Sequence, residues 1–301
     1  MSAERAKAMD GTGVARYPAI PHPIQYQGSK RNLAPAILRY FPNNIARLVE
    51  PFAGSAAISV AAAASGLAQQ FWINDINQPL LKLLKLAVEE PGALAEYYAQ
   101  LWQQQQADSI SHYGQIRDRF NQTQDPRLFL YLLARCVKGA VRYNAAGQFN
   151  QSPDKRRQGT RPDTMRNNIH GFSRLLHSKT AFTVLDYREV LQAVTPGDLV
   201  YMDPPYQGVC GRRDARYYAG INHDEFIEAL QQLNARKIPF VVSYDGRRGQ
   251  KFFGEALPDS LALTRIEINA GRSSQSTLLG IKELTFESLY LSRDLAAKLG
   301  G

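Results

Sequence analysis

The sequence contains little cysteine and no histidine spacing typical of a metal site. Its 301 residues include two cysteines, Cys136 and Cys210, and five histidines scattered along the chain. Two cysteines imply neither a disulfide framework nor a cysteine-rich zinc site, and the histidine spacing matches no common metal motif. We therefore expect no bound metal ion.

Long apolar stretches are also lacking. No segment is long and uncharged enough to predict a membrane-spanning helix, and residues 1–22 lack the apolar core of a signal peptide. Because glycines and prolines interrupt residues 1–22, we interpret them as a flexible tail. We expect a cytoplasmic protein without a membrane partner, and its oligomeric state stays open.

Positive charge is in excess. The chain has 36 Lys and Arg against 27 Asp and Glu, a net charge of +9, and 44% of its residues are hydrophobic. This hydrophobic fraction permits a sizeable core. The positive charge favours an acidic partner such as nucleic acid, and a protein bound to DNA would localise to the nucleoid.

Short apolar runs alternate with helical patterns in two separated parts of the chain. We predict strands at 48–52, 71–75, 181–185, 199–202 and 239–243, with late strands near 262–269 and 283–292 as an antiparallel edge. Predicted helices begin after Ser29, Ser55, Asn77 and Asn222, which are typical capping residues. This alternation predicts an α/β fold with a mainly parallel sheet.

Residues 89–180 interrupt that rhythm. They are mostly helical in pattern, polar and basic, and carry one hairpin signal. We therefore predict one domain formed by 23–88 and 181–301, and an inserted, mainly helical domain at 89–180.

The most informative motif is Asp203-Pro204-Pro205-Tyr206, which follows a buried strand. Ligands of α/β sheets bind at the carboxyl ends of strands, and the two prolines stiffen this turn. The Asp203 carboxylate and the Pro204 carbonyl can accept both hydrogens of an exocyclic amine, which aims the nitrogen lone pair at an electrophile. Tyr206 offers a flat face to a planar base. The alternative is a strand that simply ends in a proline-rich turn.

Other polar and small residues follow the neighbouring predicted strands. Gly54, in the run Glu50-Pro51-Phe52-Ala53-Gly54-Ser55, permits a ligand to approach a helix start, and Asp75 is placed to accept hydrogen bonds from a ribose. Ordinary βα packing and helix capping explain the same residues. Gly28 and Lys30, and further on Asp186 and Tyr187, are candidates for further ligand contacts, with capping as their alternative.

Residues 142–150 predict a β-hairpin tip that carries Arg142, Tyr143, Asn144 and Asn150. These residue types contact phosphates and base edges or wedge into a base stack. Lys155, Arg156 and Arg157 follow, and such a run is either a solvated face or a phosphate-binding segment.

Together, these segments resemble the Dam-like, D12-class DNA adenine-N6 methyltransferases over roughly residues 23–292. In order along the chain, the resemblance rests on Tyr26–Arg31, Glu50–Ser55, Asn74–Asp75, Asp186–Tyr187, the hairpin and the Asp203–Tyr206 motif. The insertion precedes the catalytic motif, as in the α arrangement of this family. One glycine stands at Gly54 where many members have two or three.

The resemblance implies a Rossmann-like, S-adenosylmethionine-dependent methyltransferase fold with an inserted DNA-recognition domain. It implies methyl transfer to N6 of an adenine flipped out of double-stranded DNA, by a solitary enzyme or one paired with a restriction endonuclease. The implied catalytic residues are Asp203, Pro204, Pro205 and Tyr206. The implied cofactor residues are Tyr26, Gly28, Lys30, Glu50, Phe52, Gly54, Asp75, Asp186, Tyr187 and Asp203.

Three alternatives remain open. RNA adenine-N6 and DNA cytosine-N4 methyltransferases use similar motifs, although a leading Asp favours adenine. A catalytically inactive nucleic-acid-binding relative is the third. The recognition sequence, which we expect residues 89–180 to carry, cannot be derived from the sequence.

Overall fold

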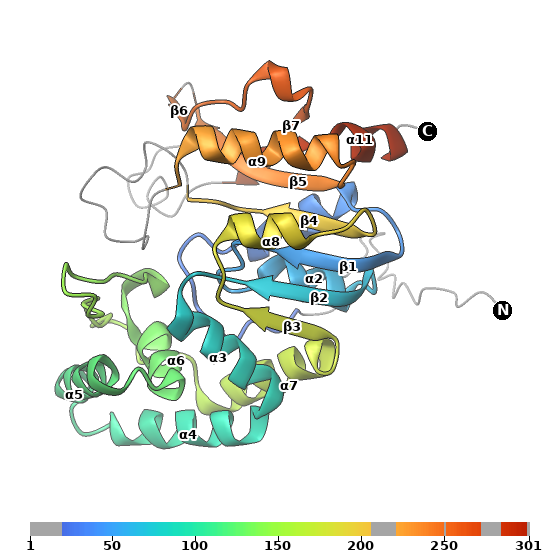
Figure 1. Ribbon diagram of the computed structural model, residues 1–301. Coiled ribbons are helices and arrows are strands. Elements are labelled where there is room, and N and C mark those ends of the chain that lie inside the picture. Colours follow the sequence, from blue (N-terminus) through green and yellow to red (C-terminus); the bar gives the residue numbers. More distant parts are fainter. Residues whose placement is uncertain (1–19, 206–220, 250, 272–283, 300–301) are drawn as a thin grey trace, which may run out of the picture.

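The computed structural model describes residues 20–205, 221–249, 251–271 and 284–299. Figure 1 shows a twisted sheet with helices on both faces and a group of helices beside its β3 end. The strands are β1 (Ile45–Glu50), β2 (Ala68–Asn74), β3 (Thr180–Thr183), β4 (Asp198–Met202), β5 (Phe240–Arg248), β6 (Lys251–Phe253), β7 (Thr264–Gly271) and β8 (Thr285–Leu291).

The strand order is β3-β2-β1-β4-β5-β8-β7, with β6 paired to β5. Strands β1 to β5 pair in parallel, whereas β6, β7 and β8 are antiparallel to their neighbours. The predicted α/β fold and its late antiparallel strands are therefore confirmed. After β3 the chain crosses to the other side of β1, so the order reverses between β1 and β4, where such sheets bind ligands.

The longer helices are α2 (Ala57–Ala64), α3 (Gln78–Glu89), α4 (Pro91–Gln104), α5 (Ser109–Thr123), α6 (Pro126–Arg135), α7 (Pro162–Leu176), α8 (Tyr187–Ala193), α9 (His223–Ala235) and α11 (Arg293–Leu299). Short helical turns are η1 (Lys30–Asn32), α1 (Ala34–Ile37), η2 (Leu38–Tyr40), η3 (Val137–Gly139) and η4 (Asp259–Leu261). No helix among the described residues is long and apolar enough to cross a membrane.

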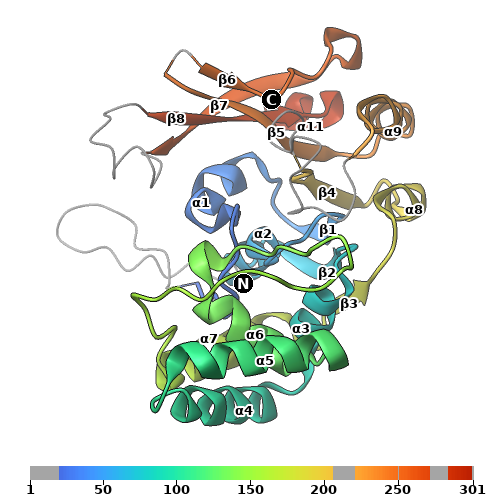
Figure 2. The same cartoon turned by 90° about the vertical axis from the view of Figure 1, so that its left-hand side faces the viewer.

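Alternate residues of the central strands face two apolar layers. On β4, Leu199 and Tyr201 belong to the core cluster that includes α2, and Val200 and Met202 belong to the cluster under α8 and α9. Figure 2 shows α8 and α9 on one side of the sheet and α1 and α2 on the other. Burial on both faces explains the continuous apolar run from Leu199 to Met202 in β4.

The helical segment at 91–176 shares a core with the sheet. Leu94, Tyr113 and Phe129 of this segment lie in one cluster with Leu48 and Phe71 of the sheet. Helix α7 also packs against α2 and α3. The predicted helical insertion is therefore present as secondary structure, but its core is continuous with that of the sheet.

Two of the four predicted helix caps are confirmed. Asn77 accepts a hydrogen bond from Leu80 N–H, and Asn222 accepts from Asp224 and Glu225 N–H. The other two were wrong: the side chains of Ser29 and Ser55 make no capping bond and instead bond each other, 2.8 Å between hydroxyl oxygens. That bond ties the segment before α1 to the turn after β1.

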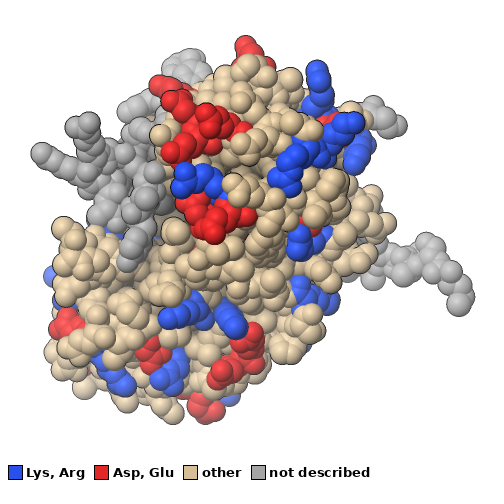
Figure 3. Space-filling view, in the orientation of Figure 1, with Lys and Arg blue, Asp and Glu red and all other residues tan. Residues whose placement is uncertain are grey.

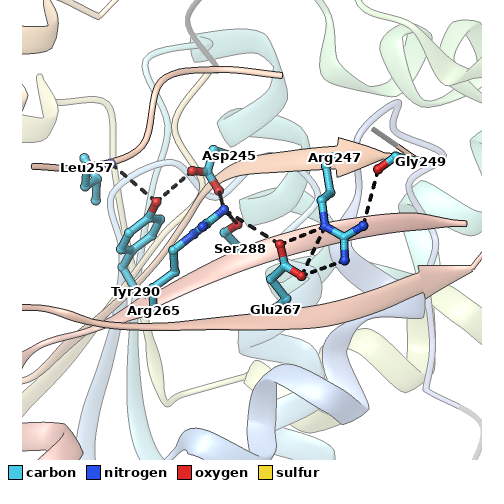
Figure 4. Close-up of polar contacts among 8 residues, drawn as sticks. All are labelled: Asp245, Arg247, Gly249, Leu257, Arg265, Glu267, Ser288 and Tyr290. Atoms are coloured by element: carbon cyan, nitrogen blue, oxygen red, sulfur yellow. Dashed lines mark hydrogen bonds and ion pairs between the residues drawn. The ribbon is translucent and has the colours of Figure 1, made fainter. Parts of the chain in front are cut away.

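Charged side chains link the antiparallel strands (Figure 4). Asp245 on β5 is buried and accepts hydrogen bonds from Tyr290 Oη at 2.7 Å and from Arg265 at 3.4 Å. Farther along the same strands, Arg247 forms an ion pair with Glu267 at 2.9 Å. The pairing of β5 with β8 shifts register between Ser243 and Gly246, where a side chain on Gly246 would lie 2.6 Å from the Phe286 carbonyl oxygen.

Candidate active site

A cavity of about 450 Å³ opens at the carboxyl ends of β1 and β4. Most of the candidate ligand residues line it, although they come from distant parts of the sequence. They are Tyr26, Gly28, Lys30, Glu50, Phe52, Gly54, Asp75, Asp186, Tyr187, Asp203, Pro204 and Pro205. Tyr206 and Cys210 lie outside the described residues.

Asp203 directly follows β4 and forms an ion pair with Lys30, 3.1 Å from Oδ1 to Nζ. The same ammonium lies 2.5 Å from Oε1 of Glu287 on β8. Burial raises the pKa of Asp203 to about 6; Lys30 opposes this shift and Glu287 adds to it. The ion pair of Asp203 with Lys30 uses Oδ1, and Asp203 lines the cavity.

Lys30 is almost enclosed, with a side chain 10% exposed. Burial opposes its charge, but the carboxylates of Asp203 and Glu287 outweigh that effect and raise the pKa of the ammonium. We expected Lys30 to meet a ligand directly. Lys30 lines the cavity, and its ion pairs also make it a partner of Asp203.

Glu50 ends β1 and is 2% exposed. Its Oε2 accepts a hydrogen bond from Ser59 N–H in α2 at 3.1 Å. Burial raises its pKa to about 7, and the negative charge of Asp203 adds to the shift. A cation in the cavity would favour the ionised form of this carboxyl group.

Asp75 holds the turn that follows β1. Its two carboxylate oxygens accept hydrogen bonds from Gly54 N–H at 2.8 Å and from Asn77 N–H at 2.9 Å. Gly54 has φ +51°, and a side chain there would lie 3.2 Å from the Tyr26 ring. A carboxylate, a glycine turn and an aromatic ring therefore form one wall of the cavity.

Asn74 joins three strand ends, a role that we did not predict. Its amide group donates to the carbonyls of Pro51 and Leu185 at 3.0 Å each. Its oxygen accepts from Leu185 N–H at 2.9 Å and from Thr183 Oγ1 at 2.8 Å. The signal available in the sequence was an Asn inside a predicted strand, directly before the candidate Asp75.

Asp186 and Tyr187 were expected to end a strand, but β3 ends at Thr183. Asp186 is the N-cap of α8, in a capping box with Glu189, and its side chain also pairs with Arg188, which lowers its pKa. Arg188 reaches Glu225 of α9 at 2.7 Å. These charged residues line the cavity as well.

Two buried polar atoms of the cavity wall have no hydrogen-bond partner among the described residues. They are the Tyr187 hydroxyl and the Gln27 side-chain oxygen, which we had not singled out. The Tyr187 ring packs on Phe52, with ring centroids 5.1 Å apart. Because buried polar atoms are normally paired, these two indicate a polar ligand beside an aromatic surface.

The predicted hairpin is present at 142–150. Tyr143 and Phe149 pair as an antiparallel bridge, and Asn144 accepts hydrogen bonds from Ala146 and Gln148 N–H. Arg142, Asn144 and Asn150 are exposed. Tyr143 is 6% exposed, however, and its hydroxyl donates to Asn77 Oδ1 at 3.3 Å. Contrary to our expectation, it supports the hairpin from beneath.

The helices hold the backbone that follows the hairpin. Arg135 is 2% exposed and donates to the carbonyls of Asp154 and Arg157. Three other side chains bond this loop: Tyr113 to the Gln151 carbonyl, Gln105 to that of Gln158 and Tyr98 to that of Thr160. Lys155, Arg156 and Arg157 are exposed on this anchored loop.

The excess positive charge does not form one patch on the face that Figure 3 shows. On the face in Figure 3, basic and acidic side chains alternate over the helical part of the molecule. Among the described residues, no group of three His, Cys, Asp or Glu side chains is arranged to hold a metal ion.

Comparison with known proteins supplies the family. A sequence model described as D12 class N6 adenine-specific DNA methyltransferase matches residues 26–273. The DNA N-6-adenine-methyltransferase of Escherichia phage P1 is 28% identical over 215 residues, which are 70% of this chain and 27% of that protein. The retron Ec67 DNA adenine methylase of Escherichia coli is 28% identical over 234 residues, 73% of this chain and 75% of that protein.

A third relative has a different type of name. The modification methylase StsI of Streptococcus sanguinis is 25% identical over 280 residues, 86% of this chain and 41% of that protein. The chain therefore spans less than half of two of these relatives and three quarters of the other.

Proposed function

The chain belongs to the D12 class of N6 adenine-specific DNA methyltransferases, and from that premise we propose that it transfers a methyl group from S-adenosylmethionine to N6 of adenine at specific sites in double-stranded DNA. One observation carries this proposal beyond family membership. A carboxylate, Asp203, stands where β4 ends, at the cavity between β1 and β4, with one oxygen held by Lys30.

This arrangement suits an exocyclic amine. Asp203 Oδ2 would accept one N6 hydrogen and the Pro204 carbonyl the other, so that the nitrogen lone pair points into the cavity. Such preorganised acceptors lower the barrier because they need no reorganisation during the reaction. Tyr206 would stack on the base after it leaves the duplex, a step that costs a few kcal/mol.

The cavity residues fit S-adenosylmethionine, which supplies an electrophilic methyl group on a cationic sulfur. Glu50 and Asp203 give the cavity the negative charge that a sulfonium requires. Asp75 would bind the ribose hydroxyls. Asp186 with Tyr187 and Phe52 would meet the adenine, where the Tyr187 hydroxyl has no partner in the described part of the chain. Tyr26, Gly28 and Gly54 would border the methionine portion.

We further propose that residues 89–180 recognise DNA. Asn144, Asn150 and Arg142 would contact bases from the hairpin, while Lys155, Arg156 and Arg157 would contact phosphates. Arg135 and its neighbours support this, because they fix the loop before DNA arrives and so lower the entropy lost on binding. Tyr143 would position the hairpin rather than enter the DNA.

The proposal extends to the biological setting. The enzyme would act on DNA in the cytoplasm, at the nucleoid. Relatives are named both DNA adenine methylase and modification methylase, so a cognate restriction endonuclease is a candidate partner. Protection of plasmid DNA from such a nuclease in cells that express the chain would establish that pairing.

Nucleoside analysis tests the proposed reaction. The chain is incubated with S-adenosylmethionine and either duplex DNA or RNA, and the digested products are identified by mass spectrometry. We expect N6-methyladenine from DNA, and none from the Asp203→Asn variant. N4-methylcytosine, a product from RNA alone, or no product with cofactor and DNA bound would refute the proposal in favour of one of the three alternatives.

A further inference from the structure

Glu287 lies at a position where the strand pattern calls for an apolar residue. On β8 it has the same parity as Leu289 and Leu291, which face the core cluster shared with Tyr201. Its side chain is only 12% exposed. A buried carboxylate needs a charged partner, and Lys30 supplies it at 2.5 Å.

The backbone is shaped to bring Glu287 there. In the register, Glu287 lies opposite Gly246, next to the irregularity between Ser243 and Gly246. Only glycine fits at Gly246, because a side chain would collide with the Phe286 carbonyl. Irregularities of this kind re-aim side chains next to active sites.

We propose that Glu287 is a positioning residue for methyl transfer, which holds Lys30 in place and shares its charge so that Asp203 can take up the proton of the amine. This rests on the proposed function. In the transfer, the N6 lone pair forms the new N–C bond, the electron pair of the S–C bond stays on sulfur, and one N6 proton must leave. We assign this proton to Asp203 Oδ2, because Oδ1 is the oxygen paired with Lys30.

The charges explain why a second carboxylate is needed. Lys30 paired with Asp203 alone would neutralise it and make it a poor proton acceptor. Glu287 draws part of the ammonium charge to the other side of Nζ. Glu50 and Tyr201 also lie near this group, and the negative charge of Asp203 raises the pKa of both.

The test is Glu287→Gln, which keeps shape and removes charge. We expect the plateau value of kcat to fall about tenfold. This is a fraction of the roughly 10²–10⁴-fold rate acceleration that a positioned proton acceptor contributes. The acid limb of the pH–rate profile should move to lower pH by about one unit, because Asp203 loses a negative neighbour. Glu287→Asp should restore both in part.

Glu267→Gln is the matched control, since Glu267 of β7, which lies next to β8, is paired with Arg247 of β5 (Figure 4). It should change neither kcat nor the profile. Carbon-13 NMR of labelled aspartate reports the titration of Asp203 without turnover, and therefore separates Asp203 from Glu50. Because this titration needs no methyl transfer, it tests the effect of Glu287 on Asp203 even if the proposed reaction is wrong.

Three results would overturn the inference. The first is an unchanged acid limb and an unchanged Asp203 titration in Glu287→Gln. The second is a fall in thermal stability with normal kcat, which would make Glu287 only a structural partner of Lys30. The third is an equal loss of kcat in the Glu267 control.

Discussion

Replacement of Asp75 would separate a cofactor role from a purely structural one. Its carboxylate accepts two backbone hydrogen bonds, from Gly54 and Asn77, at 2.8 and 2.9 Å. Hydrogen bonds to a charged group contribute about 1.5–3 kcal/mol each. We take the lower value, because burial disfavours the Asp75 carboxylate and raises its pKa. Asp75→Ala should therefore lower the free energy of unfolding by about 3 kcal/mol. Asp75→Asn keeps one acceptor and should lose about half of that.

If Asp75 also binds the ribose, the variants lose cofactor affinity beyond this loss of stability. Cofactor at 100 times its Kd stabilises a folded protein by about 2.7 kcal/mol. A tenfold weaker Kd removes about 1.4 kcal/mol of that gain. Urea unfolding with and without S-adenosylmethionine measures both quantities, and fluorescence anisotropy measures DNA affinity.

For both variants we expect a smaller cofactor-induced gain and nearly unchanged DNA affinity. The same gain as in the original chain, together with weaker DNA binding, would refute the ribose assignment. Asp75 would then only support the turn.

Three further predictions concern pH and DNA binding. The folded-state pKa of Glu50 is about 7 against an ordinary 4.5, so the free energy of unfolding of the cofactor-free chain should fall as pH rises from about 4.5 through 7. Urea unfolding of Glu50→Gln should show a weaker dependence on pH. An equal dependence in the variant and the original chain would contradict this. Affinity for S-adenosylmethionine should rise over the same pH range, because its sulfonium favours ionised Glu50. Calorimetry should find a smaller rise for S-adenosylhomocysteine, which lacks the sulfonium charge. Equal rises for the two ligands would exclude a charge interaction between the sulfonium and Glu50. Arg135→Met should weaken binding to cognate and unrelated DNA alike and reduce the dependence of DNA affinity on salt. Alanine at Lys155, Arg156 and Arg157 should do the same, by about one unit of the slope of log affinity against log salt per lost contact. An unchanged slope would make the loop a solvated face.

The sequence predicted the sheet because its strands obey simple burial rules. The run from Leu199 to Met202 in β4 is apolar because both of its faces are covered. The turn residues that follow β1 and β4 meet because parallel strands share one carboxyl edge. Asn77 and Asn222 could be identified as caps because a cap depends on neighbours two or three residues away.

Contacts between distant segments were not predictable in this way. The Ser29–Ser55 bond and the Lys30–Glu287 pair depend on how separate elements pack, which no local pattern encodes. Tyr143 was placed on an exposed tip because its residue type suits DNA, but alternation along the hairpin turns it inward beside Phe149. Glu287 had a signal, a charge at a core-facing position of β8, that we did not use.

Single-molecule sequencing of plasmid DNA tests the central claim most directly. The plasmid is taken from cells that lack adenine methylation of their own and express either the chain or its Asp203→Asn variant. We expect N6-methyladenine at every copy of one short sequence with the original chain, and no modified adenine with the variant. Unmodified adenines with the original chain, or methyl groups on cytosine, would contradict the assignment of this site to adenine-N6 transfer.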